Sequence, residues 1–149
     1  MLDPSQTFTV ANMLVLPAWV ALAASLFIPG SRRWIWRVTG LAVPAALAVA
    51  YVPLIVAGFA EAPAGGFGTI SEVRTLFASD AALTAGWLHY LAFDLLVGTL
   101  IASCGTRAGI PPLPLLLCLP LTFLAGPVGF LLFQILRLGR RTLRGSIQQ

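Results

Sequence analysis

Four long apolar stretches, separated by short polar segments, dominate the sequence. Residues 8–28 and 38–60 carry no charge, residues 81–103 contain one acid and one histidine, and residues 110–137 are apolar up to the last position. A bilayer core about 30 Å thick needs about 20 apolar residues in a helix, and lipid-exposed backbone within that core has to be helical. The pattern predicts an all-α integral membrane four-helix bundle that forms one transmembrane domain over residues 1–149.

Prolines divide these stretches into two kinds. A proline removes one hydrogen bond from the helix and bends or breaks it. The first, second and fourth stretches should therefore be kinked, and the third, which has no proline, should be the straightest. The prolines inside the stretches are Pro17, Pro44, Pro53, Pro120 and Pro127.

The connection over residues 61–80 is more polar than its neighbours. It opens with PAGGFG and then places Ile70, Val73, Leu76 and Phe77 at helical spacing. We expect a flexible glycine turn followed by a short helix that lies in the membrane interface.

The arginines that flank the stretches leave the orientation open. With four complete spans, five arginines lie on one side and four on the other, and this difference sets no orientation. If the fourth stretch instead turns back at Gly126-Pro127, the two sides carry eight and one, and such a re-entrant segment has to be shielded from lipid by protein. A complete fourth span is the expectation.

Composition supports the membrane interpretation. The chain is 58% hydrophobic and 9% charged, with a mean hydropathy of +0.92, so a water-soluble globular enzyme is excluded. The net charge of +4 comes from nine arginines between and after the apolar stretches, which indicates membrane flanks and no nucleic-acid partner. No secretory signal or transit peptide is evident at the start, so we expect the first stretch to belong to the mature protein. Two cysteines are too few for a disulfide scaffold.

Asp94 is the strongest functional signal. It lies two residues past the midpoint of the third stretch, about 3 Å from the bilayer centre. A carboxylate there costs about 2.5 to 3.5 kcal/mol, and such residues face the bundle interior with a partner. We predict a catalytic role for Asp94. The alternative is an interhelical hydrogen-bond clamp, with the carboxyl protonated.

His89, the single histidine, lies on the same stretch and is the second catalytic candidate, as a proton donor or acceptor. Five residues separate it from Asp94, which is about 140° around a helix, so the two side chains cannot touch but can flank one cavity. The hydroxyl of Tyr90, one turn from Asp94, can reach its carboxylate. A structural hydrogen bond to another helix is the alternative for His89.

Other positions complete the candidate set for substrate binding. They are polar or aromatic side chains near the depth of Asp94 or His89, together with one arginine on the interfacial segment. These candidates are Asn12, Trp87, Tyr90, Phe93, Thr122 and Arg74. Trp19, Trp34 and Trp36 lie near the ends of stretches, and we expect them to anchor the membrane interface.

No metal or cofactor site is predicted. A transition-metal catalytic site usually takes about three protein ligands, whereas the stretches offer one histidine, one aspartate and one cysteine, Cys118. The sequence also lacks a nucleophile elbow, a phosphate-binding glycine loop and a CxxC motif.

Four segments together resemble the plant abscisic-acid-deficient family, which is implicated in neoxanthin formation, and its bacterial relatives. The segments are TVANMLVLPAW, GFGTISEVRTLF, GWLHYLAFDLLVG and CLPLTFLAGPVG, which occur in this order over most of the chain. The matched positions are Asn12, Pro17, Trp19, Phe67, Gly68, Trp87, His89, Tyr90, Asp94, Gly98, Thr122, Gly126 and Pro127. The resemblance implies a four-span membrane protein of xanthophyll metabolism, and plant members are regarded as neoxanthin synthases.

The implied chemistry is an acid–base isomerisation without a redox cofactor. Conversion of an epoxide end group into an allenic alcohol needs one group that protonates the oxygen and one that removes a proton from the polyene, and we assign these roles to Asp94 and His89. The composition, rich in Ala, Arg and Gly, is typical of bacteria, so we expect a bacterial inner or intracytoplasmic membrane and a carotenoid with another end group.

Two other functions remain open. The protein can be a non-catalytic subunit that binds a carotenoid or another long apolar lipid, alone, as a homo-oligomer, or in a photosynthetic pigment–protein complex. It can also be a proton-coupled transporter, because an intramembrane Asp and His are typical relay groups. Membrane lipids are partners in every case.

Overall fold

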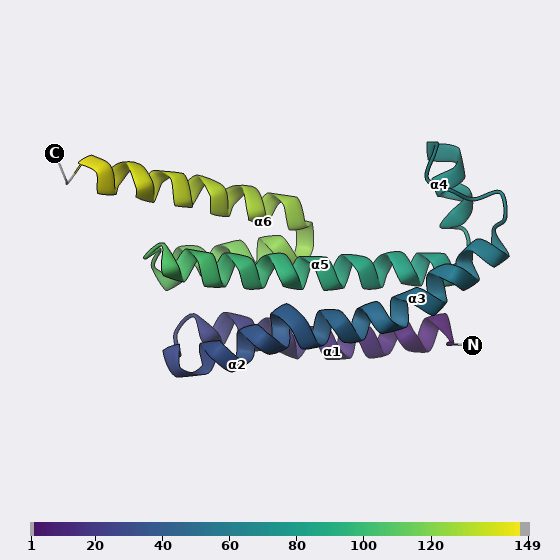
Figure 1. Cartoon of the computed structure of the whole chain (residues 1–149), viewed down its shortest axis with the longest axis horizontal. Coiled ribbons are helices and arrows are strands. Elements are labelled where there is room, and N and C mark those ends of the chain that lie inside the picture. The colour runs from purple at the N-terminus through teal and green to yellow at the C-terminus, as the bar shows by residue number, and fades with distance from the viewer. Residues whose placement is uncertain (1, 147–149) are drawn as a thin grey trace. The chain divides into compact units, whose positions relative to one another are not determined.

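The computed structural model describes residues 2–146, and side chains for residues 2–140. The described residues are mostly helical and contain no strand, as the sequence predicted (Figure 1). Its elements in order are α1 (Pro4–Ser25), the 3₁₀ helix η1 (Pro29–Ser31), α2 (Arg32–Arg37), the π-helical turn η2 (Val38–Ala42), α3 (Val43–Glu61), α4 (Ile70–Leu76), α5 (Asp80–Arg107) and α6 (Pro112–Ser146).

The described residues contain four helical segments long and apolar enough to cross a membrane, as predicted. They are Pro4–Ser25, Pro29–Glu61, Asp80–Arg107 and Pro112–Arg140. Contacts divide the chain into two compact units: unit 1 comprises Met1–Leu16 and Val43–Phe93, and unit 2 comprises Pro17–Ala42 and Asp94–Gln149. Helices α1 and α5 each run through both units.

Unit 1 is held together by a close approach of α3 and α5. A Cβ atom built on Gly58 of α3 would lie 2.5 Å from the Cβ of Ala82 on α5 and 2.8 Å from its Cα. Small residues at a helix crossing let the two backbones approach closely, which favours packing inside a membrane. Leu54 and Leu88 are buried in this unit.

The short helix expected between residues 61 and 80 is present as α4. The Thr69 hydroxyl accepts from the backbone N–H of Glu72 at 3.2 Å, and the Glu72 carboxylate accepts from the N–H of Gly68 at 3.0 Å, so the two side chains cap the helix start. Figure 1 shows α4 set across the direction of α3 and the first half of α5. Because α3 and α5 are membrane-spanning in length and composition, this direction suits a helix in the interface. Phe67 and Ile70 expose their side chains beside it.

In unit 2, side chains of α2 close the end of α1. The Arg32 guanidinium donates to the carbonyls of Ser25, at 3.1 Å, and Leu26, at 2.8 Å. The Trp36 indole N–H donates to the Ser25 hydroxyl at 3.0 Å. The two Arg32 bonds satisfy carbonyls that the end of a helix leaves without intrahelical partners, and the Trp36 bond joins α2 to the Ser25 side chain.

Helix α6 departs from the expected continuous fourth span, because it reverses direction in its middle. Ala125 has non-helical dihedrals (φ −154°, ψ 67°), and Figure 1 shows the second half of α6 running back beside the first. Pro127 explains the position of the break, since its ring excludes the carbonyl of residue 123 and it donates no N–H. The turn at Gly126-Pro127, considered above as the alternative, is therefore the arrangement that the structure has.

Two contacts link the halves of this hairpin. Near its open end, the Arg140 guanidinium donates to the Gly109 carbonyl. Near its turn, Gly129 lies so close to Thr122 and to the Cys118 carbonyl that a Cβ atom has no room. Arg140 and Gly109 are 31 residues apart, and they can form this hydrogen bond only if the chain folds back between them. Phe133, on the second half, is fully buried.

We predict that Gly129→Ala destabilises the hairpin. The added methyl would overlap the Thr122 backbone and hydroxyl, and such overpacking typically costs about 1–3 kcal/mol. Thermal unfolding in detergent, followed by circular dichroism, measures the loss. Gly30→Ala is the matched control because a Cβ there meets nothing within 4 Å; equal melting temperatures for the two variants would contradict the hairpin packing.

Candidate functional site

Asp94 lies at the middle of α5. The helix runs without interruption from Asp80 to Arg107, 28 residues, so Asp94 lies about 20 Å from either end at about 1.5 Å per residue. A helix of this length places its charged ends in the two headgroup layers and its middle at the bilayer centre. The structure therefore places this carboxyl at the middle of a helix that is long and apolar enough to cross a membrane.

The Asp94 carboxyl packs against the turn of the α6 hairpin. Its Oδ1 lies where a Cβ atom of Gly126 would be, and its Oδ2 is buried. Gly126 directly follows the helix break at Ala125. Non-helical backbone at membrane depth is tolerated only where protein groups or a water-filled cavity satisfy it. The Asp94 carboxyl therefore lies directly beside the non-helical backbone of the turn.

Trp19 of α1 packs beside the same turn and was not expected there. Only 8% of its side chain is exposed, whereas an interface anchor would be accessible. Its ring lies 2.5 Å from the position that a Cβ of Gly98 would take, and its centroid lies 5.6 Å from that of Phe123, edge-on. The prediction of an interface anchor is wrong for Trp19, because the absence of a side chain at Gly98 opens room for the indole on α5.

The indole N–H of Trp19 is buried and has no hydrogen-bond partner among the described residues. A buried donor without an acceptor costs about 1–3 kcal/mol. Gly98 is one helical turn from Asp94, and Phe123 is close in sequence to Gly126. Trp19, Asp94, Gly98, Phe123 and Gly126 therefore form one group in unit 2, which we call the carboxyl cluster.

Thr122, expected to bind substrate near the level of Asp94, instead forms a hydrogen bond within its own helix. It is fully buried, and its hydroxyl donates to the carbonyl of Cys118 at 2.8 Å, within its own helix. Its side chain also lies against Gly129. Thr122 thus supports the hairpin beside the carboxyl cluster.

In unit 1, Asn12 and Trp87 form a polar contact between α1 and α5. The Trp87 indole N–H donates to the Asn12 side-chain oxygen at 3.3 Å, and the Asn12 amide donates to the Phe8 carbonyl at 2.8 Å. The Trp87 ring lies 5.4 Å from Phe8 and 5.3 Å from Tyr90, between ring centroids. Asn12 therefore contacts Trp87, whereas the sequence suggested that it approaches His89, whose ring neighbours are Tyr51 and Phe93.

His89 and Phe93 form a stacked pair on the surface of α5. Their ring centroids are 4.4 Å apart at an interplanar angle of 21°, and the Tyr51 ring on α3 lies 6.2 Å from the imidazole. Both His89 and Phe93 are exposed. We call Tyr51, His89 and Phe93 the aromatic face.

The two catalytic candidates thus have different neighbours. Asp94 contacts Gly126 in unit 2, whereas His89 contacts Tyr51 and Phe93 in unit 1. Their separation of five residues on one uninterrupted helix turns them about 140° apart.

Arg74, the remaining candidate for substrate binding, is exposed on α4. The sequence did not indicate the contact of Tyr51 with His89 or the buried packing of Trp19, because both depend on which helices are neighbours.

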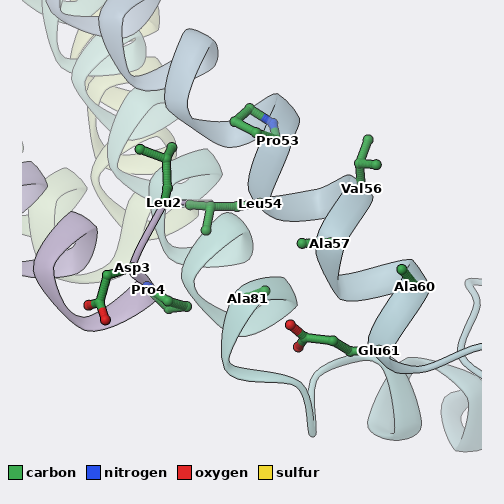
Figure 2. Close-up of a pocket in the computed structure, with 10 residues that line it drawn as sticks. All are labelled: Leu2, Asp3, Pro4, Pro53, Leu54, Val56, Ala57, Ala60, Glu61 and Ala81. Atoms are coloured by element: carbon green, nitrogen blue, oxygen red, sulfur yellow. The ribbon is translucent and has the colours of Figure 1, made fainter.

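An apolar cleft of about 630 Å³ lies between the start of α1 and helix α3 in unit 1 (Figure 2). Pro53, Leu54 and Val56 line it from α3, and its two acids are Asp3 and Glu61. Both acids already have donors, since Asp3 accepts from the N–H of Gln6 and Glu61 accepts from the hydroxyl of Ser79. Its size is within the range of small-molecule pockets, and its apolar walls suit a hydrocarbon chain.

A family model described as ABA DEFICIENT 4-like matches residues 6–133. The chain belongs to this family. A search of curated proteins and a search of solved structures found no match. The region shared with the ABA DEFICIENT 4-like family contains the carboxyl cluster, the aromatic face and both halves of the hairpin turn.

Among the described residues of this ABA DEFICIENT 4-like chain, no group of three or more His, Cys, Asp or Glu side chains can hold a metal ion. The polar atoms that the carboxyl cluster offers are a carboxyl and an indole N–H. Such a group of atoms can bind an oxygen-bearing group and move a proton.

We predict that Gly126→Ala destabilises the protein and that Asp94→Ala relieves most of this loss. The added methyl overlaps the Asp94 carboxyl, so removal of that carboxyl makes room. Residues in contact show coupling energies of about 0.5–3 kcal/mol in double-mutant cycles, measured here by thermal unfolding. In the same cycle, Gly30→Ala and Asp94→Ala should be additive, and additivity of Gly126→Ala with Asp94→Ala would disprove the contact.

Proposed function

We propose that this protein acts in carotenoid metabolism, as an acid–base isomerase that works on the oxygen-bearing end group of a carotenoid at the carboxyl cluster. Membership of the ABA DEFICIENT 4-like family supports the substrate class. The observation that carries the proposal is a single carboxyl at the centre of a membrane-spanning helix, beside a break in a neighbouring helix.

The polar atoms of the cluster match the needs of such an end group. An epoxide oxygen accepts hydrogen bonds, and the buried Trp19 N–H is a donor whose acceptor is missing among the described residues. Binding of the oxygen there would remove the cost of the unmade hydrogen bond. The Phe123 ring, edge-on to Trp19, offers an apolar wall for the attached ring of the carotenoid.

One carboxyl can complete the reaction alone. In its protonated form, Asp94 gives its proton to the epoxide oxygen as a carbon–oxygen bond breaks. The resulting carboxylate then removes a proton from the adjacent polyene carbon, whose electrons form the new double bond. Asp94 returns to its starting form and the substrate and product have the same composition, so no redox cofactor takes part.

His89 has a different place in this proposal from the one that the sequence suggested. Its stacking on Phe93 and its exposure favour a contact surface for an apolar polyene, because flat conjugated chains pack well on aromatic rings. Asp94 then carries the proton transfer, and the aromatic face binds lipid-soluble molecules from the membrane.

The second candidate function is a non-catalytic carotenoid-binding subunit. The packing of Asp94 on Gly126 favours it, because this contact is explained by the need to satisfy the hairpin turn, without any reaction. The two functions predict different fates for the pigment: it is altered by an enzyme and recovered unchanged from a binding subunit.

We expect Asp94→Asn to abolish conversion while pigment binding stays within a few-fold of the parent. The amide keeps the size of the side chain but cannot exchange the proton, and general acid–base groups contribute about 100- to 10,000-fold to rate. The measurement is chromatography and mass spectrometry of pigments from a bacterial host that makes epoxy-carotenoids. Asp80→Asn, at the start of the same helix, is the control, and conversion by Asp94→Asn at the parental rate would refute the proposal.

His89→Phe separates the two roles of the histidine. We expect it to retain conversion, because the ring that stacks on Phe93 is kept, and we expect His89→Ala to raise the pigment concentration needed for half-maximal conversion. Complete loss of conversion in a folded His89→Phe protein would show that the imidazole is the base and that Asp94 does not act alone.

A further inference from the structure

The charged side chains are strongly separated between the two ends of α1 and of α5. Asp3 precedes α1 and Asp80 begins α5, whereas Arg32 follows α1 and Arg107 ends α5. Over the whole chain, unit 1 contains four of the five acids and one arginine, Arg74, while unit 2 contains the other eight arginines.

Because α6 is a hairpin, the arginines near its end lie close to the end of α5, where Arg107 is located. The first half of α6, residues 112–124, is about 20 Å long at about 1.5 Å per residue, too short for a bilayer core of about 30 Å. Its turn meets Asp94 at the middle of α5, and Arg140 returns to Gly109, next to the end of α5. The α5–α6 loop and the end of α6 therefore lie on one side of the membrane.

Aromatic contacts mark the same end as an interface. Trp34 is 67% exposed, and the Arg37 guanidinium lies 5.6 Å from the centre of its ring. Exposed tryptophans beside arginines are typical of the headgroup layer. Arg33, Arg37, Arg107 and Arg140 are exposed as well.

We propose that these exposed arginines form a surface that binds the anionic phospholipid headgroups of the cytoplasmic leaflet. Arginine-rich flanks remain on the cytoplasmic side of membranes, where they attract anionic lipids. This surface fixes the orientation: the α1–α2 turn, the α5–α6 loop and the end of α6 face the cytoplasm. Helix α4, which directly precedes the membrane-spanning α5, lies on the opposite side. The inference does not depend on carotenoid chemistry.

Single cysteines test the orientation in a Cys104→Ala/Cys118→Ala background. Ser71→Cys places a thiol on α4, and Gly30→Cys and Gly139→Cys place thiols where a Cβ meets nothing within 4 Å. In spheroplasts, a membrane-impermeant maleimide should label Ser71→Cys at once, and the two others only after permeabilisation. If α6 crossed the membrane completely, Gly139→Cys would be labelled from outside like Ser71→Cys, and that result would overturn the re-entrant topology. Labelling of Gly30→Cys from outside would overturn the proposed orientation.

A C-terminal fusion makes the orientation test independent of the cysteine replacements. Green fluorescent protein, which becomes fluorescent in the bacterial cytoplasm, should fluoresce when fused after residue 149 of the otherwise unchanged chain. Alkaline phosphatase, active outside the cytoplasm, should be inactive at the same place. The reverse pair of results would contradict the proposal even if the cysteine variants did not fold.

Lipid binding is tested with mixed micelles that contain phosphatidylglycerol or phosphatidylcholine. Phosphatidylglycerol should raise the melting temperature of the parent protein, and high salt should remove the gain because it screens exposed charges. Arg33→Gln/Arg107→Gln should lose at least half of the gain, whereas Arg74→Gln should keep it. An equal gain in all three proteins would show that the arginine surface does not bind these headgroups.

Discussion

The packing of a carboxyl at the middle of one long apolar helix against the break in another is the constraint around which unit 2 is arranged. Asp94 lies at the middle of α5 and meets Gly126, directly after the break in α6. Neither element is favourable in hydrocarbon by itself, since an acid and open backbone groups both lose hydrogen bonds with water. In unit 2 the two lie together, and α6 reverses direction beside the middle of α5.

The same arrangement brings several polar groups together among apolar helices. A helix break, a carboxyl and a buried indole N–H lie at a depth where lipid-soluble molecules have few polar groups to meet. Glycines make the approach possible, because Gly98 admits the Trp19 ring and Gly126 admits the carboxyl of Asp94. The carboxyl contact at the hairpin turn and the buried indole therefore belong to one cluster of side chains in unit 2.

The hairpin also decides where the arginines of α6 lie within unit 2. As a complete span, α6 would carry Arg137 and Arg140 away from Arg107; as a hairpin, it returns them to the loop that follows α5. Four of the five acids, Asp3, Glu61, Glu72 and Asp80, belong to unit 1, where the apolar cleft between α1 and α3 lies near Asp3 and Glu61. An electrically uneven protein of this kind has one preferred orientation in a membrane whose leaflets differ in charge.

The sequence by itself determined the helical class, the lengths of the apolar segments, the short helix before α5 and the position of Asp94 at the middle of an apolar helix, because these follow from hydropathy and from a fixed rise per residue. Only the tertiary structure decided that α6 turns back, that Trp19 is buried and that His89 faces Tyr51 instead of Asn12. Hydropathy measures whether a segment is stable in lipid and carries no information on its direction or neighbours. Those depend on where glycines allow close approach and where a polar side chain on another helix can satisfy a broken backbone.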